Sequence, residues 1–142
     1  MRSIASGRFG LSLSARDAVG LFTPEGERTW VPGWSPAYPA GRPSETPGTV
    51  FITTADGLDT IWVIHAIDAD RSTAESARVT PGCHAGTVRV SCTDTSAGRC
   101  VVSVTYDLTL VPGGDPKVLD AYGGAAFETL MRRWSEAIRS SL

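Results

Sequence analysis

The chain has 142 residues, with 13 lysines and arginines against 15 aspartates and glutamates. A chain of this length buries roughly two-thirds of the surface that its unfolded form exposes, so residues 1–142 are predicted to form one domain that folds without a disulfide or a metal. The nearly balanced charge provides no basic surface for phosphate groups and argues against a nucleic-acid partner.

Neither a secretory leader nor a membrane-spanning segment is predicted. Residues 1–10 include arginines but lack the apolar stretch of a signal peptide, and no later segment approaches roughly 18 apolar residues. We therefore expect a cytoplasmic protein that does not insert into membranes.

Residues 2–13 alternate apolar and polar side chains, which predicts a first strand with one buried face. Ser14 then has the position of a helix N-cap, for a short helix to about Phe22. Thr23, followed by Pro24, repeats the cap signal. Two short helices are thus predicted directly after the first strand.

The middle of the chain is predicted to be an antiparallel meander. Residues 31–47 contain five prolines, which excludes a long regular element there and indicates a loop. Strand-like runs separated by turn residues follow it. They cover residues 49–54, 58–68, 73–80, 85–93 and 100–111.

The pairing register of the last of these hairpins can be predicted from its apolar and polar pattern. If residues 94–98 form the turn and the pairing is symmetric about Ser96, one face of the hairpin is apolar throughout and the other is polar. The predicted opposite pairs are Cys92 with Cys100, Val90 with Val102, Val88 with Val104, and Gly86 with Tyr106.

The Pro81-Gly82 pair predicts a two-residue turn in the preceding hairpin. Val79 would then face His84, and Glu75 and His84 would both point to the inner face. Arg78 would point outward, unless a bulge turns it inward to pair with Glu75 or to hold a ligand carboxylate.

The strand over residues 58–68 is apolar on both faces. Its periodicity therefore does not decide whether Trp62 and Ile64 or Val63 and His65 point inward. We favour Trp62.

Asp115 and Pro116 mark the start of a helix whose periodicity continues to about residue 140. Such a helix is about 37 Å long and reaches across a whole sheet. One helix does not fill the concavity of six or seven curved strands, so we expect a cavity between the helix and the sheet. The predicted apolar stripe consists of Leu119, Tyr122, Gly123, Ala126, Phe127, Leu130, Trp134 and Ile138.

Six segments of the chain carry a family resemblance: Phe22–Arg28, Trp30–Trp34, Gly48–Phe51, Thr60–Val63, Arg78–Gly82 and the final helix with Trp134. They resemble the START-like or Bet v 1-like (SRPBCC) superfamily, and within it the bacterial polyketide cyclase/dehydrase and lipid-transport group. The resemblance implies an α+β helix-grip fold, in which a curved antiparallel sheet of six to seven strands wraps around a long C-terminal helix over a hydrophobic cavity. Carriers, cyclases and chaperone regulators share this fold, so the fold alone does not define an activity.

The chain is accordingly predicted to bind a hydrophobic or amphipathic small molecule, either lipid-like or aromatic and polyketide-like, as a monomer or a homodimer. Trp30 and Trp34 are expected to plug or border the mouth of the cavity. The candidate ligand-binding residues are Trp30, Trp34, Trp62, Ile64, Val88, Val90, Val102, Val104, Tyr106, Leu119, Tyr122, Ala126, Phe127 and Leu130.

Two alternatives to a simple binding protein stay open. The first is a polyketide aromatase/cyclase or dehydratase that uses His84, Glu75 or Tyr106 for proton transfer. The second is a protein-interaction module of the chaperone-regulator type. If these residues have only structural roles, His84 is hydrogen-bonded to a neighbouring group and Tyr106 packs in the core.

No cofactor and no metal site are predicted, because the chain has neither a nucleotide-binding glycine motif nor metal-ligand spacing. The three cysteines, Cys83, Cys92 and Cys100, contain no C-x-x-C pair. Reduced, buried thiols are expected, with a cross-strand disulfide between Cys92 and Cys100 as the alternative.

Overall fold

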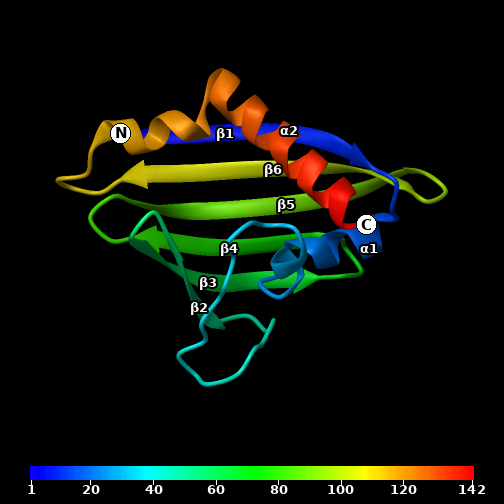
Figure 1. Cartoon of the computed structure of the whole chain (residues 1–142), viewed down its shortest axis with the longest axis horizontal. Coiled ribbons are helices and arrows are strands. Elements are labelled where there is room, and N and C mark those ends of the chain that lie inside the picture. Colours follow the sequence, from blue (N-terminus) through cyan, green and yellow to red (C-terminus); the bar gives the residue numbers. More distant parts are fainter.

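The computed structural model describes residues 1–142 and has six antiparallel strands in the order β1-β6-β5-β4-β3-β2. Five helical segments connect or cover them (Figure 1). The strands are β1 (Arg2–Leu11), β2 (Val50–Ala55), β3 (Leu58–Asp68), β4 (Thr73–Thr80), β5 (His84–Ser96) and β6 (Arg99–Leu110). The helical segments are α1 (Ala15–Val19), η1 (Gly20–Phe22), η2 (Gly26–Thr29), η3 (Pro116–Tyr122) and α2 (Gly124–Ser141).

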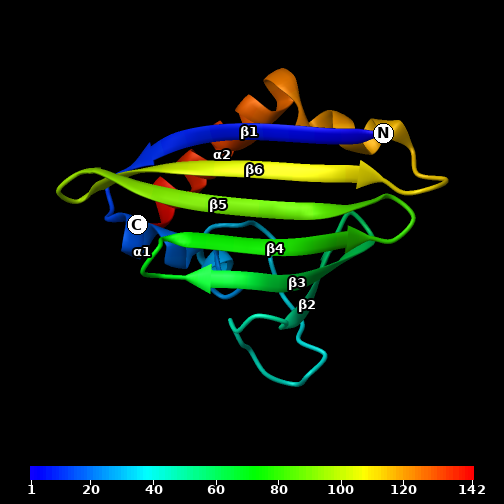
Figure 2. The same cartoon turned by 180° about the vertical axis from the view of Figure 1, so that it is seen from behind.

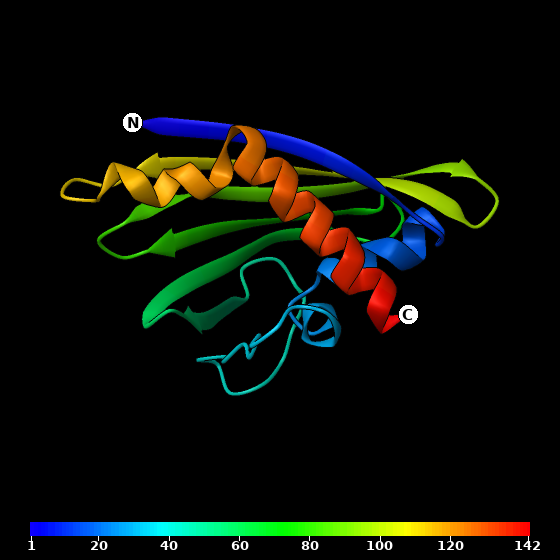
Figure 3. The same ribbon diagram turned by 45° about the horizontal axis from the view of Figure 1, so that its top comes forward.

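The sheet is curved, and α2 crosses its concave face toward the short helices that follow β1 (Figure 3). No helix covers the other face, as the view from behind shows (Figure 2). The predicted α+β helix-grip architecture, with short helices after the first strand, is confirmed, with six strands. None of the helices combines the length and the apolar character that a membrane crossing requires.

The hydroxyls of the two predicted cap residues accept hydrogen bonds from backbone N–H groups, but only Ser14 occupies the N-cap position of a helix, since the N-cap residue of η2 is Glu25. The hydroxyl of Ser14 accepts a hydrogen bond from the backbone N–H of Asp17 at 3.2 Å, and the hydroxyl of Thr23 accepts one from Gly26 at 2.9 Å. These bonds satisfy backbone donors that lack an intrahelical partner. The second segment is only a four-residue 3₁₀ turn.

The predicted pairing of β4 with β5 is wrong by one residue. Thr80 pairs with His84, so the loop has three residues rather than two, and its central Gly82 has a left-handed φ of 76°. Because side chains alternate along a strand, a shift of one residue exchanges the two faces. Arg78 is consequently buried on the inner side, whereas Glu75 lies on the outer side.

The predicted pairing of β5 with β6 is also wrong, but by two residues. Cys92 pairs with Val102 instead of Cys100, since the strands continue to a tight turn at residues 97–98, with a bulge between Asp94 and Ser96. A shift of two residues preserves the faces, so the predicted apolar inner face is present. Cys92 and Cys100 are buried free thiols, and burial raises the pKa of Cys92 to about 12.

The long C-terminal helix is interrupted, contrary to the prediction. Asp115 caps the 3₁₀ segment η3, as its side chain accepts a hydrogen bond from the N–H of Lys117 at 3.0 Å. Gly123 then has an extended backbone, and Gly124 has a φ of 54°. Two consecutive glycines make this break inexpensive, and α2 begins only at Gly124.

The break changes which side chains of the predicted stripe are covered. Phe127 and Ile138 are buried in the core as predicted, but Ala126 is exposed. Leu119 is buried from η3 rather than from the same helix. The buried face of α2 consists of Phe127, Met131, Ser135 and Ile138.

Candidate functional site

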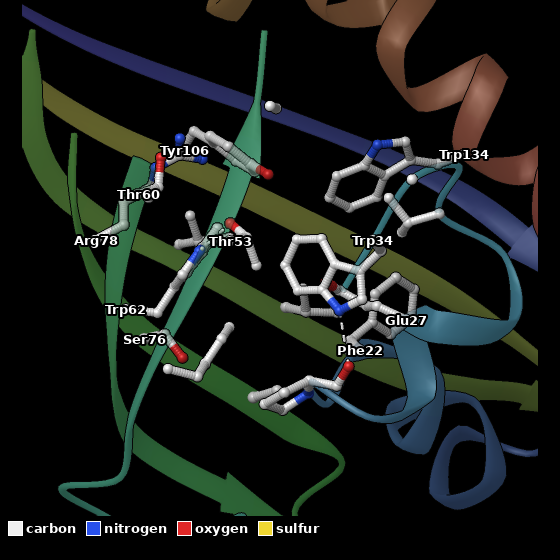
Figure 4. Close-up of a pocket in the computed structure, with 18 of the residues that line it drawn as sticks. Phe22, Glu27, Trp34, Thr53, Thr60, Trp62, Ser76, Arg78, Tyr106 and Trp134 are labelled. Atoms are coloured by element: carbon white, nitrogen blue, oxygen red, sulfur yellow. Dashed lines mark hydrogen bonds between the residues drawn. The ribbon is translucent and has the colours of Figure 1, made fainter. Parts of the chain in front are cut away.

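A cavity of about 670 Å³ lies between the concave face of the sheet, α2 and the segment from Phe22 to Trp34. This volume is within the usual range of small-molecule sites, and most of the wall is apolar. Figure 4 shows Trp34 and Trp134 on one side of the space, facing the side chains that rise from the sheet. The apolar wall includes Phe22, Val31, Trp34, Phe51, Trp62, Ile67, Val88, Val90, Leu130 and Trp134.

Three aromatic rings form one continuous part of this wall. Trp62 stacks on Phe51 with ring centroids 5.5 Å apart, and Trp34 meets Trp62 edge-on at 5.9 Å. The indole N–H of Trp34 donates to the carbonyl of Pro24 at 2.8 Å, and that of Trp62 donates to the hydroxyl of Thr53 at 3.0 Å. Since both indole donors are satisfied within the protein, the rings offer apolar surface to a ligand.

Trp30 belongs to the core and does not line the cavity. Its ring is buried and meets Trp134 at 5.3 Å and Phe22 at 5.6 Å, both edge-on. Its indole N–H donates to the carbonyl of Leu21 at 2.8 Å. Of the two tryptophans expected at the mouth of the cavity, Trp34 lies in its wall and Trp30 lies in the core.

Arg78 brings a positive charge to the inner face of the sheet. Its side chain points into the concavity, and only 9% of the residue surface is exposed. The guanidinium carbon lies 4.7 Å from the ring centroid of Trp62 and 5.9 Å from those of Tyr106 and Tyr122. Such contacts stabilise a cation partly removed from water.

Glu27 lies on the opposite side of the cavity from Arg78 (Figure 4). Burial raises the pKa of its carboxyl well above the usual value, and the positive charge of Arg78 opposes this rise only in part. Sequence reasoning missed Glu27, because nothing nearby distinguishes it from Glu25. The carboxylate of Glu25 instead accepts hydrogen bonds from Arg28 and Tyr38.

The predicted catalytic candidates do not form a cluster. Glu75 lies on the outer face, where its carboxylate is 3.5 Å from Nδ1 of His65. His84 is buried beside Tyr122 with an unpartnered Nδ1 but does not line the cavity, and burial, aided by Arg78, lowers its pKa. Tyr106 lies at the cavity wall, where burial raises the pKa of its hydroxyl.

The predicted ligand-binding residues divide into three groups. The first group lines the cavity: Trp34, Trp62, Val88, Val90, Tyr106, Tyr122 and Leu130. The second group is buried away from it: Trp30, Ile64, Val102, Val104, Leu119 and Phe127. Ala126 alone is exposed.

The sequence pattern missed several wall residues besides Glu27. Phe51 lies in the strand-like run of residues 49–54, and Trp134 lies in the apolar stripe of α2, so both carried a detectable signal. Arg78 points inward because the loop before His84 has three residues, and not because of a bulge in β4. No cluster of three or more His, Cys, Asp or Glu side chains is placed to hold a metal ion.

Comparison with solved structures establishes the fold class. Norcoclaurine synthase from Thalictrum flavum, in complex with dopamine and hydroxybenzaldehyde, superposes with a TM-score of 0.69 at 11% identity over 99% of this chain and 88% of its own. Ara h 8.0201 gives a TM-score of 0.70 at 13% identity, with 99% of both chains covered. The Mll3558 protein from Rhizobium loti gives 0.70 at 14% identity, covering 100% of this chain and 98% of its own.

The protein thus has the Bet v 1-like helix-grip fold. At these identities the likeness concerns the fold and carries no activity with it. No family model matches the sequence, and no curated protein matches it. Functional conclusions for this chain therefore rest on its own cavity.

The carboxyl of Glu27 predicts a pH-dependent stability difference. Because its pKa is raised in the folded chain, the unfolded chain releases this proton first as the pH rises above about 4.3, and the folded state loses stability until it releases the proton too. Glu27→Gln removes this loss. Urea unfolding should show that the variant has a slightly higher free energy of unfolding than the wild type at pH 4 and a clearly higher one at pH 7.5. If the difference between the two proteins is the same at both pH values, the burial of this carboxyl is contradicted.

Proposed function

We propose that this protein binds a hydrophobic or amphipathic small molecule, lipid-like or aromatic and polyketide-like, in the cavity between the sheet and α2. The observation that carries the proposal is the 670 Å³ cavity with a wall of aromatic rings whose indole donors are already satisfied. Burial of apolar surface would drive binding, with few polar groups left to fix the orientation.

A structure with the same fold supports this proposal. Norcoclaurine synthase from Thalictrum flavum has been solved with dopamine and hydroxybenzaldehyde, which are small aromatic molecules. The aromatic wall of Trp34, Phe51 and Trp62 suits ligands of that kind, because offset and edge-on ring contacts add to the burial of area.

Trp34→Ala tests the binding site directly. The variant should bind the neutral fluorescent probe N-phenyl-1-naphthylamine about tenfold more weakly, since the probe loses one aromatic face of the cavity. Fluorescence titration gives the affinity, and thermal unfolding of the same samples gives the stability.

The comparison of the two measurements decides the role of Trp34. A large loss of stability with unchanged probe binding would show that this ring belongs to the core instead. If the wild-type chain binds no such probe, and freshly purified protein carries no small molecule in native mass spectrometry, the binding function itself is wrong.

Glu27 favours proton transfer as a second candidate function. A carboxyl whose pKa is raised in an apolar cavity is suited to general acid–base chemistry near neutral pH. An aryl ketone incubated with the protein in D₂O would exchange the hydrogens on the carbon next to its carbonyl. Exchange that is lost in Glu27→Gln would select the enzyme, whereas binding without exchange would select the carrier.

A further inference from the structure

The guanidinium of Arg78 has an unmet hydrogen-bonding requirement. Its Nε is fully buried and has no hydrogen-bond partner. Nearly all buried side-chain donors in proteins are paired, so an unpartnered nitrogen on a charged group is unusual. With Nε covered, the terminal amino groups are the donors that remain for the cavity.

No carboxylate of the protein lies within ion-pair distance of this charge. The chain's five ion pairs all involve other side chains, on the outside of the molecule. Besides Arg78, the charged residues that line the cavity are Glu27 and Asp56, and Asp56 lies on the exposed turn between β2 and β3. A buried cation without a partner is strongly unfavourable in an apolar surrounding.

The groups that surround the guanidinium are aromatic rings and hydroxyls, including the hydroxyl of Tyr106, and none of them carries a charge. Trp62, Tyr106 and Tyr122 surround it with aromatic faces. The nearby hydroxyls of Thr60 and Thr80 are hydrogen-bonded to each other at 2.8 Å, and that of Thr53 accepts from Trp62. Because these rings and hydrogen bonds fix the surroundings, the charge is oriented in advance for an acceptor from outside the chain.

The opposite wall does not supply that acceptor. Glu27 faces Arg78 across the cavity but lies beyond ion-pair distance. Burial raises its pKa well above the usual value, which disfavours the anionic form. Glu27 is therefore a weaker counter-ion for Arg78 than an ordinary glutamate would be.

We propose that the ligand of this cavity is an apolar monocarboxylate whose carboxylate pairs with the terminal nitrogens of Arg78. Its apolar body then lies against Trp34, Trp62 and Leu130. A guanidinium matches the two oxygens of a carboxylate with parallel hydrogen bonds, which adds orientation as well as affinity. This inference rests on the proposed binding function and specifies the chemistry of its ligand.

The experiment compares matched acids and neutral analogues by isothermal titration calorimetry at pH 7.5. The aromatic pair is 1-naphthaleneacetate and 1-naphthaleneacetamide, and the aliphatic pair is decanoate and decan-1-ol. The wild-type chain should bind the acid of at least one pair about tenfold more tightly than its neutral analogue. The pair with the greater affinity tells whether the natural body is aromatic or aliphatic.

Arg78→Met removes the charge and keeps the apolar bulk of the side chain. The acid should then lose its advantage, while the neutral analogue binds within about threefold of the wild type. Arg78→Lys should restore part of the preference, because a point charge replaces the planar fork. Arg89→Met is the matched control, since Arg89 lies exposed on the outer face of β5 and should leave both affinities unchanged.

Each result bears on a different claim. Equal affinity of acid and neutral analogue in the wild type, or a preference that survives in Arg78→Met, overturns the carboxylate assignment while the binding function stands. Failure of all four compounds to bind the wild type overturns the binding function. The wild-type comparison requires no variant, so it decides the assignment even if Arg78→Met does not fold.

Discussion

Replacement of Trp30 by alanine is expected to lower the free energy of unfolding by about 3–5 kcal/mol. The ring is buried between Phe22 and Trp134, so its removal opens a hole where the short helices meet α2. The carbonyl of Leu21 would also lose the indole donor that satisfies it. Urea unfolding of the variant and the wild type measures the effect.

Trp34→Ala is the matched control for this prediction. The two tryptophans are four residues apart, but Trp34 is only half-buried and lines the cavity. Trp34→Ala should lower the free energy of unfolding less than Trp30→Ala does. It should weaken binding of the probe more than Trp30→Ala does. If Trp30→Ala unfolds at nearly the wild-type urea concentration, the packing of Trp30 against α2 is wrong.

Gly86→Ala is expected to lower the free energy of unfolding by about 3 kcal/mol or more. Gly86 pairs with Arg78 on one side and with Leu108 on the other. A methyl group at this residue would overlap the backbone carbonyl of Asp107 in β6. Backbone atoms of a paired strand do not yield as a flexible side chain does, so β5 and β6 would have to separate locally.

Gly20→Ala controls for the general effect of removing a glycine. Gly20 has right-handed helical angles, and an added Cβ would touch nothing within 4 Å. This variant should be unchanged or more stable by a few tenths of a kcal/mol, because alanine restricts the unfolded chain. Circular dichroism during thermal unfolding compares the two variants, and equal transitions would contradict the close approach at Gly86.

The layers of the fold were predictable because each depends on a repeated pattern. Alternation marked the strands, and the stripe through Phe127 and Ile138 marked the covering helix. The cap at Ser14 and the hydrogen bond of Thr23 were predictable for a similar reason, since each is a single contact between residues three apart. A prediction from a pattern over many residues, or from a contact within three residues, stays correct even when the bounds or the register of another element are predicted wrongly.

The predictions that were wrong or incomplete each depended on a single local feature, such as the length of one loop or the break in one helix. One additional loop residue before His84 reversed the faces of β4, and the Gly123-Gly124 pair ended a helix whose periodicity continued across it. Glu27 became a cavity residue only through the way that the turn at Gly26–Thr29 packs over the sheet. A single sequence does not reveal how such turns pack.

The hairpin loop of Pro81, Gly82 and Cys83 therefore determines more than the connection between two strands. Glu75 and Arg78 are three residues apart, so they always point to opposite sides of β4. An odd number of loop residues presents the arginine to the cavity, and an even number would present the glutamate. Whether the number of residues in this loop is odd or even thus determines the sign of the charge that β4 presents to a ligand. The residues of the strand itself need not change.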